Sequence, residues 1–482
     1  MNKAFLAHFR CPAQAVDFRL GGSLSKELGY FRFGEGVDCY GQSSANPPSA
    51  NYRIHLDNVS RAVKVEGSQV TLPFDPDQIA DNLRCESYSG QMGEEHTQLG
   101  GNPVIRAMYY LGRPAFPVHF RRILQRIRLQ GGTHEPFPHW PVDRTVDRLF
   151  EELMKLVLKS RANAPVPFIW FWPEGAPAAA ILTHDVETEL GRDYCSQLMD
   201  IDDEFGFKAS FQLVPERRYE VKPSFIEDMR QRGFEVNVHD LYHDGHLFRN
   251  REEFLRRASK INSYVKKFNA DGFRSGALYR NLHWYDAFKF SYDMSVPNVG
   301  HLDAQTGGCC TVMPYFVGRI LEIPVTATQD YSLFHILSSY STTLWEEQCR
   351  MILAGHGLIS VIVHPDYIIS KRPNNTYRRL LAHLRYLREK RFVWTALPGE
   401  INKWWRTRSE LSLVPEGSGW RIEGEGRERA RIAYAHLIDG RLKYSFASTP
   451  AGAVPEDQAD FNTGLPPGNS AWPRSPNSVS TG

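Results

Sequence analysis

The chain has 482 residues, a length that suits one to three domains. Hydrophobic residues make up 42% and charged residues 23%, values that argue against a wholly disordered chain, a collagen or a coiled coil. The formal net charge of +2 favours neither nucleic acid nor an anionic membrane as a partner, and no apolar run approaches the ~20 residues of a membrane-spanning helix.

The cysteines and the N-terminus bear on the cellular compartment. Seven cysteines are scattered along the chain without a Cys-x-x-Cys pair, which argues against a disulfide framework and against a zinc ribbon. The first apolar stretch, residues 4–6, is too short for the centre of a signal peptide. We therefore expect a cytoplasmic protein.

The first 163 residues are rich in glycine, proline and polar side chains, and we expect two helices within them. Residues 118–130 carry a cluster of arginines, which could bind an anion but is more often a solvated helix face. Residues 143–159 place apolar side chains at helical spacing. A proline-rich stretch at 165–177 is typical of a linker that leads into the first strand of the next region.

Residues 178–405 alternate between strand and helix patterns. About seven such units in one block predict a parallel sheet, either a barrel or a doubly wound sheet. Strands are expected at 178–183, 208–214, 234–238, 272–274, 292–296, 320–325, 358–363 and 392–395. Helices are expected at 194–205, 223–232, 250–268, 344–354 and 377–390, with a last one from Pro398.

The remaining residues differ in composition. Residues 410–446 alternate around glycine-containing turns, which predicts a small antiparallel β module, and the stretch from residue 450 has the composition of a disordered segment. We therefore predict an N-terminal accessory region over 1–163, an α/β domain over 164–409, a β module over 410–449 and a disordered tail over 450–482.

Polar side chains gather where four of the predicted strands end. Active sites in parallel α/β folds lie at the carboxyl ends of the strands, so these side chains are expected to share one rim. They are Asp185 and Glu187, His239 and His243, Arg274, and His364.

His239 and His243 are four residues apart. On a helical turn both imidazoles would lie on one face and could reach a single metal ion. A carboxylate from the first strand would complete a site for a divalent cation such as zinc. In a chain with 17 histidines the spacing could also be a coincidence, but the acidic strand end and the separate His364 favour the metal site.

These residues resemble the motifs of the polysaccharide deacetylase family, which has a NodB-homology domain, over about half of the chain. The resemblance implies a distorted (β/α)7-type barrel. Thr183-His184-Asp185-Val186 stands at the first motif, which is Thr-Phe-Asp-Asp in the family. The second, third and fifth motifs are matched by His239 and His243, by Arg274 and by His364, and Asp330 is the nearest counterpart of the fourth.

The resemblance also implies the roles of these residues. Asp185 matches the general base, whereas Val186 replaces a metal-ligating aspartate. Glu187 is the natural substitute ligand, although Asp185 could instead be the ligand with Glu187 as the base. His364 matches a general acid, and Arg274 would orient the catalytic carboxylate or form a structural ion pair.

The resulting hypothesis is a metal-dependent hydrolase that binds one divalent ion, expected to be zinc, and removes an acetyl group from N-acetylated sugars. Its partner would be a carbohydrate, with no nucleic acid and no transmembrane segment, and the oligomeric state is left open. Two alternatives are a catalytically inactive member that binds glycan or scaffolds polysaccharide assembly, and a glycosidase on a related barrel.

Overall fold

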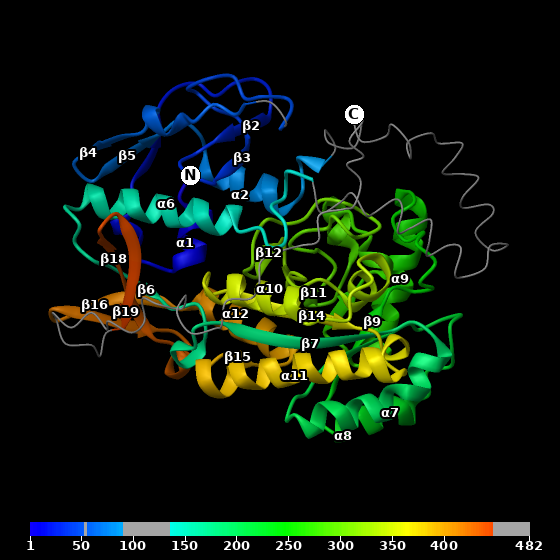
Figure 1. Cartoon of the computed structure of the whole chain (residues 1–482). Helices are drawn as coiled ribbons and strands as arrows, with labels where there is room; N and C mark the ends of the chain where they lie inside the picture. The colour runs from blue at the N-terminus through cyan, green and yellow to red at the C-terminus, as the bar shows by residue number, and fades with distance from the viewer. Residues whose placement is uncertain (53–54, 90–134, 447–482) are drawn as a thin grey trace, which may run out of the picture.

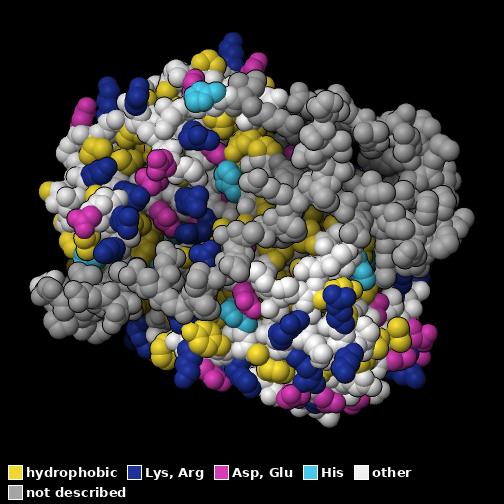
Figure 2. Space-filling model, viewed as in Figure 1, with side chains coloured by type: hydrophobic (Ala, Val, Ile, Leu, Met, Phe, Trp, Pro, Cys, Tyr) yellow, Lys and Arg dark blue, Asp and Glu magenta, His cyan; other side chains and the backbone are white. Residues whose placement is uncertain are grey.

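The computed structural model describes residues 1–52, 55–89 and 135–446. The helix predicted at 118–130, with its arginines, and the tail predicted from residue 450 lie outside the described residues. Within the described part of the chain, no helix is both long enough and apolar enough to cross a bilayer. Basic and acidic side chains are interspersed over the face shown in Figure 2, as the small net charge leads one to expect.

A curled, mostly parallel sheet forms the centre of the molecule (Figure 1). Its order is β12-β13-β11-β10-β9-β8-β7-β14, with β15 also paired to β7 and β12 antiparallel to β13. The strands are β7 (Ala179–Val186), β8 (Ser210–Leu213), β9 (Glu235–His239), β10 (Gly272–Arg274), β11 (Tyr292–Asp293), β12 (Tyr315–Val317), β13 (Ile320–Glu322), β14 (Leu358–Val363) and β15 (Trp394–Thr395).

The segment that follows β13 brings the two sides of this sheet together. The Thr326 hydroxyl donates to the carbonyl of Leu358 at 2.7 Å, and the backbone N–H of Ser360 donates to the same hydroxyl at 2.9 Å. The N–H of Ala327 donates to the carbonyl of Ser360 at 3.1 Å. The sheet is therefore a distorted barrel, which confirms the predicted fold class.

Helices cover the outside of the barrel at the places that the sequence predicts. In Figure 1, α7, α8 and α11 lie on one side of β7 and the N-terminal strands on the other. Side-chain caps explain two helix starts: Asn250 accepts from the N–H of Glu253 at 2.9 Å, and Thr188 accepts from the N–H of Gly191 at 3.0 Å. The helices are α7 (Glu189–Glu204), α8 (Pro223–Gln231), α9 (Arg251–Lys267), α10 (Thr343–Leu353), α11 (Lys371–Arg391) and α12 (Pro398–Glu410).

The N-terminal region forms two small sheets, β1-β5-β4 and β2-β3, packed with three helices. The expected helix over 143–159 is α6. The elements are α1 (Lys3–Phe9), β1 (Phe18–Leu20), β2 (Gly29–Arg32), β3 (Asp38–Gly41), β4 (Lys64–Glu66), β5 (Gln69–Leu72), α2 (Pro76–Arg84) and α6 (Thr145–Ser160).

The proline-rich stretch is not the linker that its composition indicates. Its first part is a buried strand, β6 (Val166–Ile169), and β6 pairs antiparallel with β18 (Ile432–Ile438). Burial of the aromatic side chains of Phe168 and Trp172 outweighs the tendency of proline to interrupt regular structure. Of the other C-terminal strands, β16 (Ser412–Glu416) contacts β6, β17 (Gly419–Glu423) contacts β18, and β19 (Arg441–Phe446) pairs with β18 and contacts Trp170. One apolar cluster joins these strands to the N-terminal region.

Arg408 on α12 holds three of these segments together. Its guanidinium is fully buried and donates to the carbonyls of His8 and Ile169, each at 2.7 Å, and of Trp170 at 2.9 Å. No carboxylate of the described residues lies within ion-pair distance of it. The carbonyl oxygens therefore supply all of the observed hydrogen-bond acceptors for this buried cation.

Replacement of Arg408 by alanine should lower the free energy of unfolding by about 3 kcal/mol, because three buried carbonyls lose their donor and a cavity remains. Chemical denaturation of the full chain measures this change. Lys403→Ala, at an exposed position of the same helix, is the matched control and should shift stability by less than about 0.5 kcal/mol. Equal stability of the two variants would contradict the structural role of Arg408.

Candidate active site

The parallel pairing of the strands brings the predicted site residues to one rim of the barrel. His239 is the last residue of β9 and stands opposite Arg274, the last residue of β10. His364 follows β14, which pairs with β7 so that Val363 stands opposite His184. The side chains of all six predicted residues contact at least one other member of the group.

One carboxylate oxygen of Glu187 faces three imidazoles. Glu187 Oε1 lies 2.9 Å from His243 Nε2, 3.3 Å from His364 Nε2 and 3.7 Å from His239 Nε2. Burial alone would raise the pKa of Glu187, but its interactions with the neighbouring His243 and His364 hold it well below the ordinary value. Glu187 is therefore a carboxylate at neutral pH.

Glu187, His239 and His243 also form the arrangement expected of a metal site. Their ligand atoms all lie within 4.8 Å of one another. The Nε2 atoms of both histidines are buried and make no aligned hydrogen bond, although Glu187 is close. His239 Nδ1 lies 3.0 Å from the carbonyl oxygen of Arg274, which orients the ring and leaves the Nε2 lone pair free. Two imidazoles and one carboxylate are a donor set that fits zinc.

His243 differs from His239 in its second ring nitrogen. The guanidinium of Arg218 donates to His243 Nδ1 at 3.1 Å and to the carbonyl of His243 at 2.6 Å. A guanidinium can only donate, so this contact favours the tautomer with its proton on Nε2. For Nε2 to ligate a metal, the proton must move to Nδ1 and Arg218 must leave that nitrogen.

The histidine pair is not placed by a helical turn, and that part of the sequence expectation is wrong. Residues 240–243 are not helical, and Asp240 and His243 have left-handed backbone angles, with φ of 54° and 52°. The loop packs on Gly276, where an added Cβ would lie 2.7 Å from Asp240 Oδ2 and 3.0 Å from His243 Cδ2. A glycine on the neighbouring strand end thus makes room for the turn that brings the two rings within 4.8 Å of each other.

Asp185 is held by a buried ion pair with Arg274. Arg274 Nη1 donates to Asp185 Oδ1 at 2.6 Å and to Thr183 Oγ1 at 2.9 Å, and its Nε donates to the carbonyl of Met294 at 2.8 Å. Burial would raise the pKa of Asp185, but Arg274 and the nearby histidines lower it below the ordinary value. Asp185 Oδ2 lies 3.9 Å from His239 Nε2, at the edge of the group formed by Glu187 and the three histidines, here called the Glu187 cluster. This position is consistent with Asp185 as base and Glu187 as ligand, whereas the reverse assignment would need Asp185 to move closer.

His364 is anchored by Asp330, a residue that the sequence indicates only as the nearest counterpart of a motif. The fully buried carboxylate of Asp330 accepts from His364 Nδ1 at 2.6 Å and from the backbone N–H of His364 at 2.8 Å. Burial opposes protonation of His364, but Asp330 and Glu187 raise its pKa well above the ordinary value. The ring is therefore held as an imidazolium whose Nε2 faces the cluster.

No family model and no curated protein matches the chain. Among solved structures, a protein described as a polysaccharide deacetylase from Mycobacterium smegmatis matches with a TM-score of 0.42 and 17% identity, over 52% of this chain and 98% of that one. The peptidoglycan deacetylase PdaC from Bacillus subtilis matches with a TM-score of 0.32 and 12% identity, over 48% and 93%.

A family 4 acetyl xylan esterase from Clostridium thermocellum, solved with a cobalt ion, matches with a TM-score of 0.31 and 15% identity, over 47% of this chain and 91% of that one. Two of these three proteins are described as deacetylases of sugar polymers, the family that the sequence motifs resemble. At such identities and TM-scores the matches carry no inference about activity, which has to come from the side chains.

Metal content should separate the roles of the two carboxylates. His239→Ala and Glu187→Gln each remove a predicted ligand, so zinc affinity should fall by more than the ~10–100-fold typical of an outer-shell residue. Asp185→Asn should keep its zinc but lower turnover by about 10²–10⁴-fold. Elemental analysis and zinc titration of the purified variants measure this. Full zinc retention in the His239→Ala/His243→Ala double variant would rule out the site, and the reverse pattern for the carboxylates would show that their roles are exchanged.

Proposed function

We propose that the protein is a metal-dependent hydrolase that removes the acetyl group from N-acetylated sugars, with zinc as its ion. The observation that carries this proposal is the juxtaposition at one rim of three different functional groups. A donor set for a divalent ion lies beside a carboxylate kept ionised by Arg274 and an imidazole kept protonated by Asp330.

These groups match the needs of amide hydrolysis. A divalent ion held by Glu187, His239 and His243 would supply Lewis acidity toward water and toward the amide carbonyl. Asp185, ionised and fixed in direction by Arg274, would take a proton from the attacking water. His364 would give its Nε2 proton to the amine nitrogen as the C–N bond breaks, because Asp330 holds the other ring nitrogen. Acetate and an amino sugar are the products.

The two parts of the proposal have different support. Hydrolysis of an amide is supported by the side chains described above. The choice of an N-acetylated sugar as the substrate is supported by the resemblance of the motifs to polysaccharide deacetylases, and the particular sugar is open.

The contacts of the two carboxylates favour this function over a glycosidase. A glycosidase needs two carboxyl groups that are free to act on either side of a glycosidic bond. Here Asp185 is bound to Arg274, and Glu187 faces three histidines. A member that only binds glycan would have no need for the Asp330–His364 pair, although Val186 at the first motif keeps that alternative worth testing.

The test is product analysis. Zinc-loaded protein incubated with N-acetylglucosamine oligomers should release acetate and leave the oligomer length unchanged. New reducing ends without acetate would favour the glycosidase. Stoichiometric zinc and saccharide binding without either product would favour the inactive member.

His364→Ala should lower turnover by about 10²–10⁴-fold while zinc content stays unchanged, since a general acid lost from the site slows the breaking of the C–N bond. The loss should be smaller for an acetanilide substrate, because its leaving group is an aniline, which needs less protonation than the amine of a sugar. Loss of zinc in His364→Ala would make this residue a ligand instead. An unchanged rate would leave it as a packed histidine.

Asp330→Asn should move the alkaline limb of the pH–rate profile to lower pH. Asp330 raises the pKa of His364, so the acid form persists to higher pH in the parent protein than in the variant. With the charge removed, the imidazolium loses its proton at a lower pH, and activity falls there. The full pH profile of turnover measures this shift, and Asp193→Asn, an exposed residue on α7, is the matched control. An identical alkaline limb in Asp330→Asn would contradict the role of the pair.

A further inference from the structure

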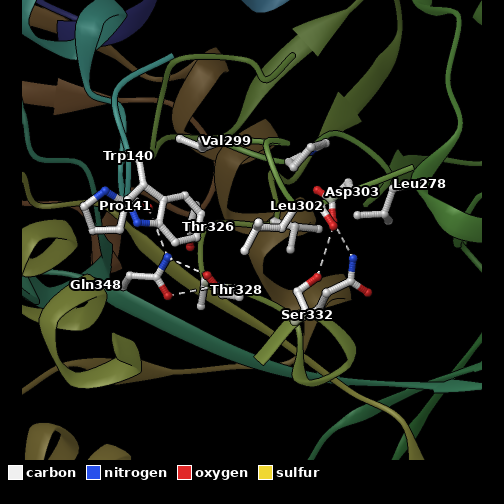
Figure 3. Close-up of a pocket in the computed structure, with 14 residues that line it drawn as sticks. Trp140, Pro141, Leu278, Val299, Leu302, Asp303, Thr326, Thr328, Ser332 and Gln348 are labelled. Atoms are coloured by element: carbon white, nitrogen blue, oxygen red, sulfur yellow. Dashed lines mark hydrogen bonds between the residues drawn. The ribbon is translucent and has the colours of Figure 1, made fainter. Parts of the chain in front are cut away.

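A small pocket with polar and apolar lining residues (Figure 3) lies among the segments that follow β10, β11 and β13, at the strand ends. Its volume of about 20 Å³ is room for one water-sized group. Figure 3 shows Trp140 and Pro141 on one side and Asp303 and Leu278 on the other. Trp140 and Pro141 come from the N-terminal accessory region, so two parts of the chain build the pocket together.

The segments that line the pocket also contribute to the candidate active site. Gln329 lines the pocket, and the next residue, Asp330, holds His364. Leu278 lines the pocket two residues after Gly276, on which the loop of His243 packs. The pocket and the candidate site are therefore built from adjoining segments of the chain.

The polar side chains of the pocket are fixed and ready to accept a hydrogen bond. Asp303 is more than nine-tenths buried, and the amide nitrogen of Gln329 donates to its Oδ1 at 2.6 Å. A carboxylate can accept further hydrogen bonds beyond this one. Gln348 bonds to Thr328 at both ends of its amide, with distances of 2.9 and 3.0 Å, and so holds the opposite wall in place.

Trp140 gives the pocket a flat aromatic border. Its ring is half-buried and lies nearly parallel to that of His301, with an interplanar angle of 18° and centroids 6.4 Å apart. Aromatic rings with one apolar face and a nearby polar group are suited to packing against the C–H face of a sugar. A second contact also joins the accessory region to this part of the barrel. Glu86 forms a buried ion pair with Arg280, which lies in the loop after Leu278.

We propose that this pocket is a specificity site that receives the primary hydroxyl of a hexosamine unit, with Asp303 accepting its hydrogen bond and Trp140 bordering the ring. The hydroxymethyl group projects furthest from a hexopyranose ring, and its hydroxyl is the size of the water that the pocket can hold. This inference rests on the proposed function, and it gives the N-terminal accessory region a part in substrate selection.

The test compares an N-acetylglucosamine tetramer with the same tetramer built from 6-deoxy units. Acetate release should show a kcat/KM at least fivefold higher for the parent tetramer in the unmodified protein. In Asp303→Asn this preference should fall to near unity. The matched control is Asp147→Asn on α6, because Asp147 is also buried, with a pKa raised by burial to about 6, but it bonds to Thr311 and Val312 away from the pocket. Asp147→Asn should keep the preference.

Calorimetric binding of both tetramers to the Asp185→Asn variant, with and without the Asp303 substitution, separates this inference from the proposed function. Binding that prefers the parent tetramer only when Asp303 is present supports the pocket even if no acetate is released. Acetate release with equal kcat/KM for the two tetramers overturns the pocket and leaves the function standing. A preference that survives in Asp303→Asn also overturns it. The comparison of the two tetramers in the unmodified protein tests the pocket without any variant.

Discussion

The buried ion pair of Arg274 and Asp185 is the constraint on which the site depends. Arg274 has no exposed surface, so its charge must be met inside the protein by Asp185, by the Thr183 hydroxyl and by the carbonyl of Met294. These partners come from β7 and from the segment after β11, so one side chain fixes the spacing across the barrel mouth. Removal of either charge would leave the other buried and unpaired, which costs several kcal/mol. The ion pair thus links the strands of the barrel and also keeps Asp185 ionised.

The remaining charged side chains of the rim lie around the Arg274–Asp185 ion pair. Glu187 brings a second carboxylate within 4 Å of three imidazoles, and Asp330 brings a third carboxylate against the far side of His364. Two acids therefore act on His364, one on each ring nitrogen, whereas His239 faces a backbone carbonyl on its second nitrogen. The two histidines therefore differ. His364 is held in its charged form, which favours a proton donor. His239 is oriented with a free lone pair, which favours a metal ligand.

The parts of the fold that the sequence predicts well are those that depend on local pattern. The strand at 358–363 is a continuous apolar run buried on both faces, and the start of α9 is set by the Asn250 side chain. Four strand ends were enough to find Asp185, His239, Arg274 and His364, because parallel strands deliver their ends to one rim. The turn at His243 could not be foreseen, since it depends on Gly276 from another strand. The pairing of β6 with β18 joins residues more than 260 positions apart, and no local signal encodes it.

The same separation explains why the role of the N-terminal region could not be read from its composition. The N-terminal region reaches the barrel through a few residues that are distant in sequence from their partners. Glu86 pairs with Arg280, the Tyr88 hydroxyl donates to the carbonyl of Gly308, and Trp140 lines the pocket across from Asp303. Gly308 has a φ of 149°, and an added Cβ there would lie 2.2 Å from the carbonyl oxygen of Asn298. The end of the loop that carries Asp303 therefore requires glycine at this position. Removal of residues 1–163 would leave all six residues of the candidate site in the chain, but it would take away Trp140 and Pro141, which line one side of the pocket across from Asp303.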